Sequence, residues 1–258
     1  MSGTDSQDLI FEDDFDDDQL DTGKWFPHYL PHWSSLTRSA ASYRIEDSRL
    51  RLFIREDQRP WCPEFDGEVK VSGIQTGHFS GALGSRRGQH RFSQSVQVRE
   101  ELPNLRLFLP QYCRLEMKAR ASLNPWNLAA LWLIGFEDDP DQSGEITLFE
   151  AFGHDVQANS ARIGRGIKKI HDPHLRDAID QGELAISVSE WHVYSMDWTP
   201  FGVAFYVDGK LVTQTTQSPS YPMQLMLNFY DLPSDAPRTS SKEAWFDVDF
   251  IRAYRRYS

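Results

Sequence analysis

Residues 203–213 read VAFYVDGKLVT, and this stretch predicts a β-hairpin. A run of β-prone apolar residues ends at Val207, and a second run resumes at Leu211. Asp208-Gly209 between them is a dipeptide typical of two-residue hairpin turns, because both positions must accept a left-handed backbone. The stretch therefore predicts two antiparallel neighbours in a β-sheet.

Further short β-prone segments lie on both sides of this hairpin. They are residues 48–54 (SRLRLFI), 114–121 (RLEMKARA), 225–229 (LMLNF) and 245–254 (WFDVDFIRAY). Helical signals are few, and 175–181 is the only stretch that suggests a short helix. Many short strands with turns between them predict an all-β sandwich or barrel. With no linker or repeat, we expect one domain over residues 10–258, preceded by a disordered polar segment, residues 1–9.

The composition of this 258-residue chain argues against several classes of partner. A formal net charge of −11 argues against a nucleic acid or an anionic membrane surface, and suits a neutral ligand. No stretch approaches the roughly 20 apolar residues of a membrane span. The aromatic content of 13% suits both strands and sites that stack on flat ligands. Cys62 and Cys113 are expected to be free thiols, and the protein is expected to be a monomer.

The first residues, MSGTDSQDLIFEDDFDDD, lack the basic and apolar regions of a signal peptide. We expect a cytoplasmic protein if this terminus is native, and a secreted one if a signal was removed. Residues 62–110 form the least regular part of the chain and carry six basic or imidazole side chains between 86 and 106. They are expected to form a long loop insertion with a hairpin of its own, and long ordered loops are often functional.

Common catalytic and metal motifs are absent. His171 and His174 flank Pro173, and His28 and His32 lie next to prolines, so neither pair is aligned on a helix to hold a metal. Residues 144–153 (GEITLFEAFG) differ, because they place two glutamates in an apolar strand. In a regular strand Glu145 and Glu150 face opposite ways, and one β-bulge would bring them to the same face. Such a pair could act as the two carboxylates of a glycosidase, whereas the alternative is one solvated glutamate and one that caps a turn.

This segment resembles the E-x-D-x-x-E signature of glycoside hydrolase family 16, which includes laminarinases and lichenases. Similar stretches extend over nearly the whole chain, at residues 11–25 (FEDDFDDDQLDTGKW), 72–76 (SGIQT), 191–200 (WHVYSMDWTP), 205–209 (FYVDG) and 248–254 (VDFIRAY). The resemblance implies a concanavalin A-like β-jelly roll, a sandwich of two antiparallel sheets with a concave substrate cleft. It also implies a retaining endo-glycosidase that hydrolyses internal β-linkages of a polysaccharide, with a β-1,3-glucan-like substrate expected first.

The resemblance implies roles for particular residues. Glu145 corresponds to the nucleophile and Glu150 to the general acid/base. Trp132 corresponds to a tryptophan beside the cleavage subsites, and core packing is its alternative role. Trp126 and His192 are further candidates for lining the cleft. No cofactor is implied for catalysis, but many members bind a structural Ca²⁺, for which Asp249, Glu12 and Asp47 are the matching candidates.

One position departs from the family pattern, because Thr147 replaces the central Asp. Threonine can hydrogen-bond to Glu145 but brings no charge. Three hypotheses therefore stay open: an active hydrolase, a weak or inactive relative that binds glycans like a lectin, and a transglycosylase or galactan-active enzyme. The third includes an anionic glycan held by the arginines between 86 and 106.

Overall fold

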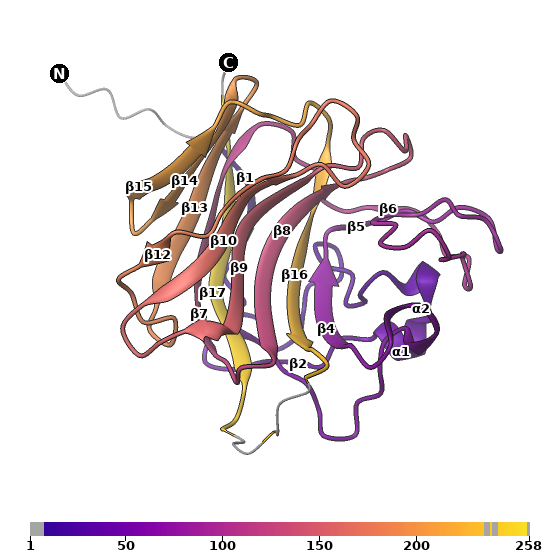
Figure 1. Ribbon diagram of the computed structural model, residues 1–258, viewed down its shortest axis with the longest axis horizontal. Coiled ribbons are helices and arrows are strands. Elements are labelled where there is room, and N and C mark those ends of the chain that lie inside the picture. The colour runs from indigo at the N-terminus through magenta and orange to yellow at the C-terminus, as the bar shows by residue number, and fades with distance from the viewer. Residues whose placement is uncertain (1–7, 235–237, 239–241, 257–258) are drawn as a thin grey trace.

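The computed structural model describes residues 8–234, 238 and 242–256. Within them, two large antiparallel sheets lie one behind the other (Figure 1), so the predicted β-sandwich is confirmed. The eight-stranded sheet has the order β15-β14-β13-β7-β17-β3-β2, and β1 also pairs with β17. Its strands are β1 (Leu9–Asp13), β2 (Tyr43–Ile45), β3 (Leu50–Leu52), β7 (Cys113–Ser122), β13 (His192–Thr199), β14 (Gly202–Val207), β15 (Lys210–Thr215) and β17 (Trp245–Arg255).

The seven-stranded sheet carries the two glutamates. Its order is β11-β10-β9-β8-β16-β4, and β12 also pairs with β10. Its strands are β4 (Lys70–Gln75), β8 (Asn127–Gly135), β9 (Glu145–Val156), β10 (Ala161–Lys168), β11 (Ala178–Asp180), β12 (Glu183–Leu184) and β16 (Met223–Asp231). Strands far apart in sequence are neighbours in both sheets, as in a jelly roll.

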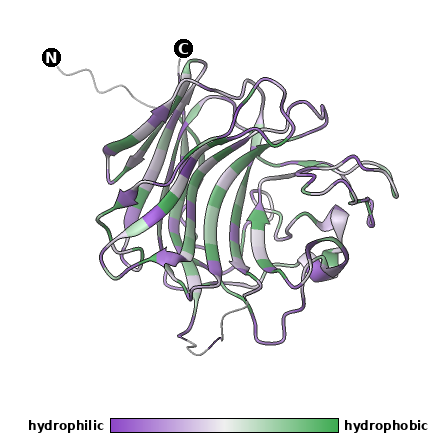
Figure 2. Cartoon of the chain, viewed as in Figure 1, coloured by the Kyte–Doolittle hydropathy of each residue, from purple (hydrophilic) through white to green (hydrophobic). Residues whose placement is uncertain are grey.

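Apolar side chains from both sheets form one core between the layers. β7 alternates buried and half-buried residues along its whole length, because only one of its faces meets the core. Every residue of β8 is buried, because a second apolar cluster covers its other face. That cluster includes Trp33, Trp61 and Val96, which lie in segments outside the strands of the sandwich. Figure 2 shows the central strands of the seven-stranded sheet coloured mostly as hydrophobic.

Residues 62–110 are only in part the predicted insertion. β4 lies inside this range and is an integral strand of the seven-stranded sheet, paired with β16. The expected extra hairpin is confirmed in outline, because β5 (Gly77–His78) pairs with β6 (Leu105–Arg106). The purple segments at the right of Figure 1, with the short helix α2 (Pro63–Asp66), belong to this region. The segments that follow β4 therefore form part of the wall beside the sheet.

Local predictions had mixed outcomes. The hairpin at Asp208-Gly209 is confirmed: Val207 pairs with Lys210, and both turn residues have positive φ angles of 49° and 73°. The helix suggested at 175–181 is wrong, because Ala178–Asp180 form β11 at the edge of the sheet beside β10. The helical elements of the described residues are instead short and lie elsewhere: η1 (Pro31–Trp33), α1 (Leu36–Ser39) and α2.

Three further predictions concern the N-terminal residues, the two cysteines and membrane-spanning segments. The predicted disorder of residues 1–9 falls mostly outside the described residues, and Leu9 already belongs to β1. Cys62 and Cys113 are buried free thiols, as expected. Among the described residues, we find no helix with the length and apolar content needed to span a membrane.

Candidate active site

A β-bulge in β9 brings the two glutamates to one face of the sheet. Leu131 of β8 pairs with Phe149, but the next residue, Trp132, pairs with Thr147, so Leu148 is an extra residue in β9. Leu148 and Phe149 consequently both point into the core between the sheets. Glu150 returns to the face that carries Glu145, which confirms the predicted bulge.

Thr147 lies between the glutamates and contacts one of them. Its Oγ1 donates a hydrogen bond of 2.6 Å to Oε1 of Glu145. Both side chains are buried, with exposures of 0% and 1%, whereas Glu150 is half-buried. The hydroxyl therefore fixes one carboxylate oxygen of Glu145 without adding a negative charge.

Lys168 joins the two glutamates and is a site residue that the sequence did not reveal. It is the last residue of β10 and pairs directly with Glu145. Its Nζ lies 3.1 Å from Oε1 of Glu145 and 2.9 Å from Oε1 of Glu150. Burial lowers the pKa of Lys168, but the carboxylates of Glu145 and Glu150 outweigh this effect and raise it overall. The ammonium therefore stays charged. No sequence motif marks Lys168, because its role depends on the pairing register of β10 with β9.

The shared ammonium limits the distance between the glutamates. Because both Oε1 atoms contact one nitrogen, at 3.1 and 2.9 Å, they cannot be more than about 6 Å apart. Retaining glycosidases hold their two carboxyl groups about 5–5.5 Å apart, and inverting enzymes about 6.5–9.5 Å. The upper limit in this site lies below the inverting range.

Two glycines of β10 lie opposite the site on β9, and one of them leaves space beside Glu150. Gly164 pairs with Glu150 and Gly166 pairs with Thr147. A Cβ at Gly164 would lie 3.0 Å from Oε2 of Glu150. The missing side chain at Gly164 thus leaves space beside Oε2 of Glu150, while Oε1 contacts Lys168.

Trp132 is brought to the glutamates but is largely covered. It pairs with Thr147 across the strands and is 8% exposed. The His90 ring meets its indole edge-on, with centroids 4.9 Å apart. Burial, and then the charge of Lys168, lower the pKa of His90 to about 4, so this imidazole is neutral at pH 7. Trp132 therefore adjoins the site while most of its surface contacts protein.

The structure does not bring Trp126 and His192 together with the glutamates. Trp126 precedes β8, and its ring lies under the guanidinium of Arg238, 5.1 Å away, in a separate cavity. His192 is on β13 of the other sheet, where Nδ1 lies 2.7 Å from an Asp208 oxygen. Among the described residues, no hydrogen bond or ring contact joins either side chain to the glutamates, because Trp126 lies before the start of β8 and His192 lies on the other sheet.

The three candidate calcium ligands do not form one site. Arg252 pairs with Glu12 at 2.7 Å, Lys118 with Asp249 at 2.7 Å, and Arg49 with Asp47 at 3.0 Å. Across residues 8–234, 238 and 242–256, no group of three or more His, Cys, Asp or Glu side chains could hold a metal. These carboxylates therefore do not fit a shared ion. A structural Ca²⁺ bound through backbone oxygens stays a prediction.

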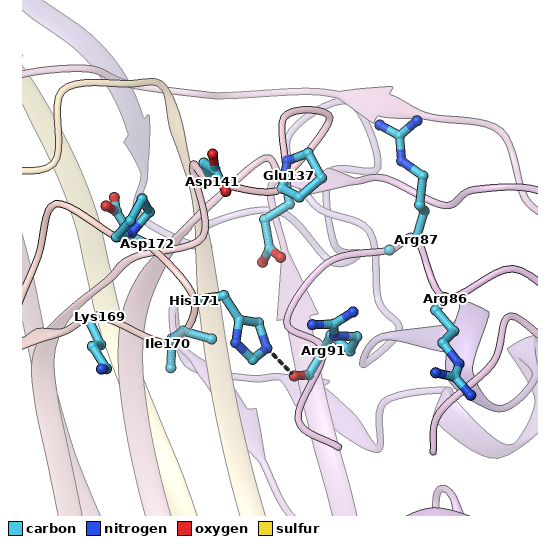
Figure 3. A pocket seen from close by; sticks show the side chains of 12 residues that line it. Arg86, Arg87, Arg91, Glu137, Asp141, Lys169, Ile170, His171 and Asp172 are labelled. Atoms are coloured by element: carbon cyan, nitrogen blue, oxygen red, sulfur yellow. Dashed lines mark hydrogen bonds between the residues drawn. The ribbon is translucent and has the colours of Figure 1, made fainter. Parts of the chain in front are cut away.

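A cavity of about 520 Å³ lies where β8 and β10 end, lined by Glu137, which follows β8, and by residues 169–173, which follow β10 (Figure 3). Glu137 is 5% exposed. Its Oε1 accepts a hydrogen bond of 2.6 Å from the backbone N–H of His90. Burial raises the pKa of Glu137 to about 8, despite this bond and the charge of Arg91. The cavity therefore contains a carboxyl group that is mostly protonated at pH 7.

The fold and the site together resemble one class of protein, the jelly-roll carbohydrate-active enzymes that carry two glutamates on a bulged strand. The sequence profile of glycosyl hydrolases family 16 matches residues 108–247, which include β9, β10 and the whole glutamate pair. This match covers more than half of the chain. The chain belongs to glycosyl hydrolases family 16.

Individual relatives agree with this assignment. The GlcNAcα1-4Gal releasing endo-β-galactosidase of Clostridium perfringens superposes with a TM-score of 0.83 and 31% identity, over 96% of this chain and 63% of that one. A laminarinase from a Flavobacterium species superposes with a TM-score of 0.64 and 16% identity, over 96% and 100% of the two chains. The glucan endo-1,3-beta-glucosidase A1 of Niallia circulans is 22% identical over 96% of this chain. The present chain spans only 38% of that glucosidase.

Proposed function

We propose that this protein is a retaining endo-β-glycosidase, with Glu145 as the nucleophile and Glu150 as the general acid/base. The observation that supports the proposal is the upper limit of about 6 Å between their Oε1 atoms, which is compatible with the separation of about 5–5.5 Å in retaining enzymes. Family membership supports the reaction class. Both assignments follow the order of the glutamates in the family signature.

In the first step, Glu150 protonates the glycosidic oxygen while a Glu145 oxygen attacks the anomeric carbon. The bond to the leaving sugar breaks, and a covalent glycosyl ester forms on Glu145. In the second step, Glu150 takes a proton from water, which attacks the same carbon and releases Glu145. An acceptor sugar in place of water would give transglycosylation.

Thr147 and Lys168 support the nucleophile in this scheme. The Thr147 hydroxyl orients one oxygen of Glu145, and the Lys168 ammonium lies beside that same oxygen. The ammonium thus places a positive charge directly beside the attacking oxygen in this buried position. Lys168 thus partly takes over the ordering of the site that the central Asp provides in the family pattern.

Two substrate classes are candidates. A β-1,3-glucan is favoured by the glucosidase relative, which aligns over 96% of this chain. A β-galactoside is favoured by the endo-β-galactosidase, whose identity of 31% and TM-score of 0.83 exceed the laminarinase values of 16% and 0.64. The second likeness is stronger, and we therefore place internal β-galactosidic linkages first.

The decisive experiment offers the protein β-1,3-, β-1,4- and mixed-linkage glucans, neutral and sulfated galactans, and mucin-type glycans, with product anomers followed by NMR. We expect cleavage of at least one polymer with net retention of the β-configuration. Glu145→Gln and Glu150→Gln should each abolish cleavage without unfolding. Glu183→Gln, an exposed glutamate of β12, is the matched control and should keep full activity.

Each alternative has its own outcome in this experiment. An α-anomer as first product would contradict the retaining mechanism, and near-normal turnover by either glutamine variant would contradict the assigned roles. Azide should partly restore the activity of Glu150→Ala on a substrate with a good leaving group. Such a leaving group departs without a proton, and azide can then attack the glycosyl ester without help from a general base. Binding without cleavage of any polymer would favour the lectin-like alternative.

A further inference from the structure

The face of the seven-stranded sheet that carries the glutamates can be followed by strand pairing from β9 to β4. Directly paired residues of antiparallel strands lie on the same face. Ala130 of β8 pairs with Glu150 on one side and with Asn228 of β16 on the other, and Asn228 pairs with Gly73 of β4. By the same pairing, this face also carries Leu128, Trp132 and Ile134 of β8, Gln224, Met226 and Tyr230 of β16, and Val71 and Gln75 of β4. All these residues of β8, β16 and β4 are buried.

The protein itself covers this part of the face. Residues 79–104, which lie between β5 and β6 and which we call the covering segment, contribute Val96 and Val98 to the second apolar cluster. Trp33 and Trp61 join the same cluster from earlier parts of the chain. In Figure 1 the segments next to β5 and β6 lie on the β4 side of the sheet, whereas β10 and β12 lie on the opposite side. The cover is therefore confined to one side of the glutamates.

A chain of buried amides holds the covering segment on the sheet. The Nε2 of Gln89 donates to Oε1 of Gln224, and the Nε2 of Gln224 donates to Oε1 of Gln75 at 2.9 Å. The Oε1 of Gln89 accepts a hydrogen bond of 2.8 Å from the backbone N–H of Phe79. All three glutamines are 0% exposed. Because buried amides are costly without partners, this chain favours one fixed position of the segment.

The other side of the glutamates is more open. The side chains of Glu150 and Lys168 are 15% and 27% exposed. Phe152, which follows Glu150 on the same face of β9, and Ile179 of β11 are half-buried, and His154 is exposed. Among the described residues, the second apolar cluster includes no residue of β10, β11 or β12. A sugar ring can therefore contact the sheet on the β10 side.

The direction of a bound glycan follows from the positions of the glutamates. Glu145 and Glu150 are spaced along β9, so a chain whose scissile linkage lies between them crosses this strand. It runs toward β10 on one side and toward β8 on the other. On the β8 side its sugars would need volume that packed side chains fill, because protein interiors leave few voids larger than a water molecule. The chain can continue along the sheet only on the β10 side.

We propose that the covering segment, held by Gln89, determines where a glycan is cut. The segment ends the binding face at β8, so the protein cleaves a short and fixed number of sugars from one end of the chain. A product of two or more sugars still comes from an internal linkage. The proposal rests on the proposed glycosidase function and specifies that this site acts near chain ends, not at random linkages. Gln89 is thus a specificity-determining residue that acts through the position of the segment.

The first test follows product lengths from the polymer that the wild type cleaves in the panel above, with the reducing ends labelled by a fluorophore. We expect one short product from the earliest times and little loss of viscosity, because each cut removes only a chain end. The distribution of the label shows which end is shortened. A ladder of many product lengths with a rapid fall in viscosity would overturn the proposal while still upholding the glycosidase.

The second test loosens the covering segment. Gln89→Ala removes the amide contacts with Gln224 and Phe79, so we expect faster hydrogen exchange in residues 79–104 and a severalfold larger share of longer products. Gln97→Ala is the matched control, because Gln97 is an exposed glutamine of the same segment, and its products should equal those of the wild type. Faster exchange with an unchanged product pattern would overturn the proposal. If exchange is unchanged, the role of Gln89 is wrong. If Gln89→Ala does not fold, the wild-type product pattern decides.

Failure of the proposed function gives a different result. If the wild type cleaves no polymer, the glycosidase proposal is wrong, and calorimetry with laminarin and a β-galactan, each in a long and a short fraction, decides the inference. One bound protein per glycan chain at both lengths would support a site that accepts only chain ends. A number of bound proteins that rises with chain length, or no binding to any fraction, would overturn it.

Discussion

Lys168 is the residue on which the geometry of the site depends. A single ammonium contacts both glutamates, one of which is 1% exposed. A carboxylate in such a position is costly unless a positive charge or hydrogen-bond donors compensate it. Thr147 supplies one donor and Lys168 supplies the charge, so the buried Glu145 carboxyl group has two neighbours of different chemistry.

Removing this charge should change the pH dependence of the reaction. In Lys168→Met we expect kcat/KM to fall at least about tenfold and the acidic limb of the rate profile to move to higher pH. The reason is that an ammonium favours the ionised form of a nearby carboxylate. Lys168→Arg, which keeps the charge, should move the limb back toward its wild-type position. An unmoved acidic limb in Lys168→Met would mean that Lys168 has only a structural role.

Thr147 allows the opposite change. Thr147→Asp adds a third carboxylate beside Glu145, and like charges favour retention of a proton within the group. We therefore expect the basic limb of the rate profile to move to higher pH than in the wild type. A shift of half a pH unit corresponds to about 0.7 kcal/mol and is measurable. Thr147→Asn, similar in shape to Asp but uncharged, is the control. A basic limb at the same pH in Thr147→Asp and Thr147→Asn would contradict an electrostatic effect of the added carboxylate.

At the scale of elements, β9 and β10 act as a pair. The bulge at Leu148 turns both glutamates to one face, and β10 supplies Lys168 opposite Glu145 and glycines opposite the rest of the site. Neither strand forms the site alone. The loop carrying His90 then covers Trp132, which makes the segment between β5 and β6 part of the site.

The two glycines of β10 should respond differently to substitution. In Gly164→Ala the new Cβ would lie 3.0 Å from Oε2 and 3.3 Å from Cβ of Glu150, so we expect reduced turnover and only a small decrease in melting temperature. In Gly166→Ala the residue has a φ of 141°, and the Cβ would lie 2.1 Å from the backbone oxygen of Ala178 in β11. That variant should lose on the order of 2 kcal/mol of stability. Thermal unfolding and activity assays on both variants check this contrast, and equal melting temperatures would contradict it.

At the scale of the whole molecule, Glu137 links stability to pH. The pKa of Glu137 is about 8 in the folded protein, whereas the pKa of a glutamate in an unfolded chain is about 4.3. The folded state therefore binds more protons between these values, and this contribution to stability is lost as the pH rises toward 8.

Glu137→Gln should remove that dependence. Glutamine can still accept the hydrogen bond from His90, but it never has to ionise in a buried position. We expect the free energy of unfolding of the variant, relative to that of the wild type, to rise between pH 5 and pH 8. The rise should be a few kcal/mol at most, because each unit of pKa difference corresponds to about 1.4 kcal/mol. Urea unfolding at both pH values measures this, with Glu183→Gln as an exposed control. A constant difference across this range would contradict the buried, protonated carboxyl group.

Short β-prone runs and the Asp208-Gly209 turn were enough to predict the sandwich, because strand alternation and turn chemistry are local properties. The apolar surroundings of Glu145 and Glu150, together with the resemblance, were enough to predict the bulged pair. The helix suggested at 175–181 failed because pairing of β11 with β10 outweighed a weak local preference.

Only the tertiary structure decided which distant residues meet the glutamates. Lys168 reaches them through the register of β10, and His90 reaches Trp132 through a long loop. Strand order likewise places His192 on the other sheet, and Trp126 precedes β8 and lines a separate cavity. The three acidic calcium candidates each pair with a different basic residue. Sequence alone determined the main strands, the Asp208-Gly209 turn and the presence of two glutamates in one strand. Pairing register is a property of two strands at once, so the charge around those glutamates was decided by the folded chain.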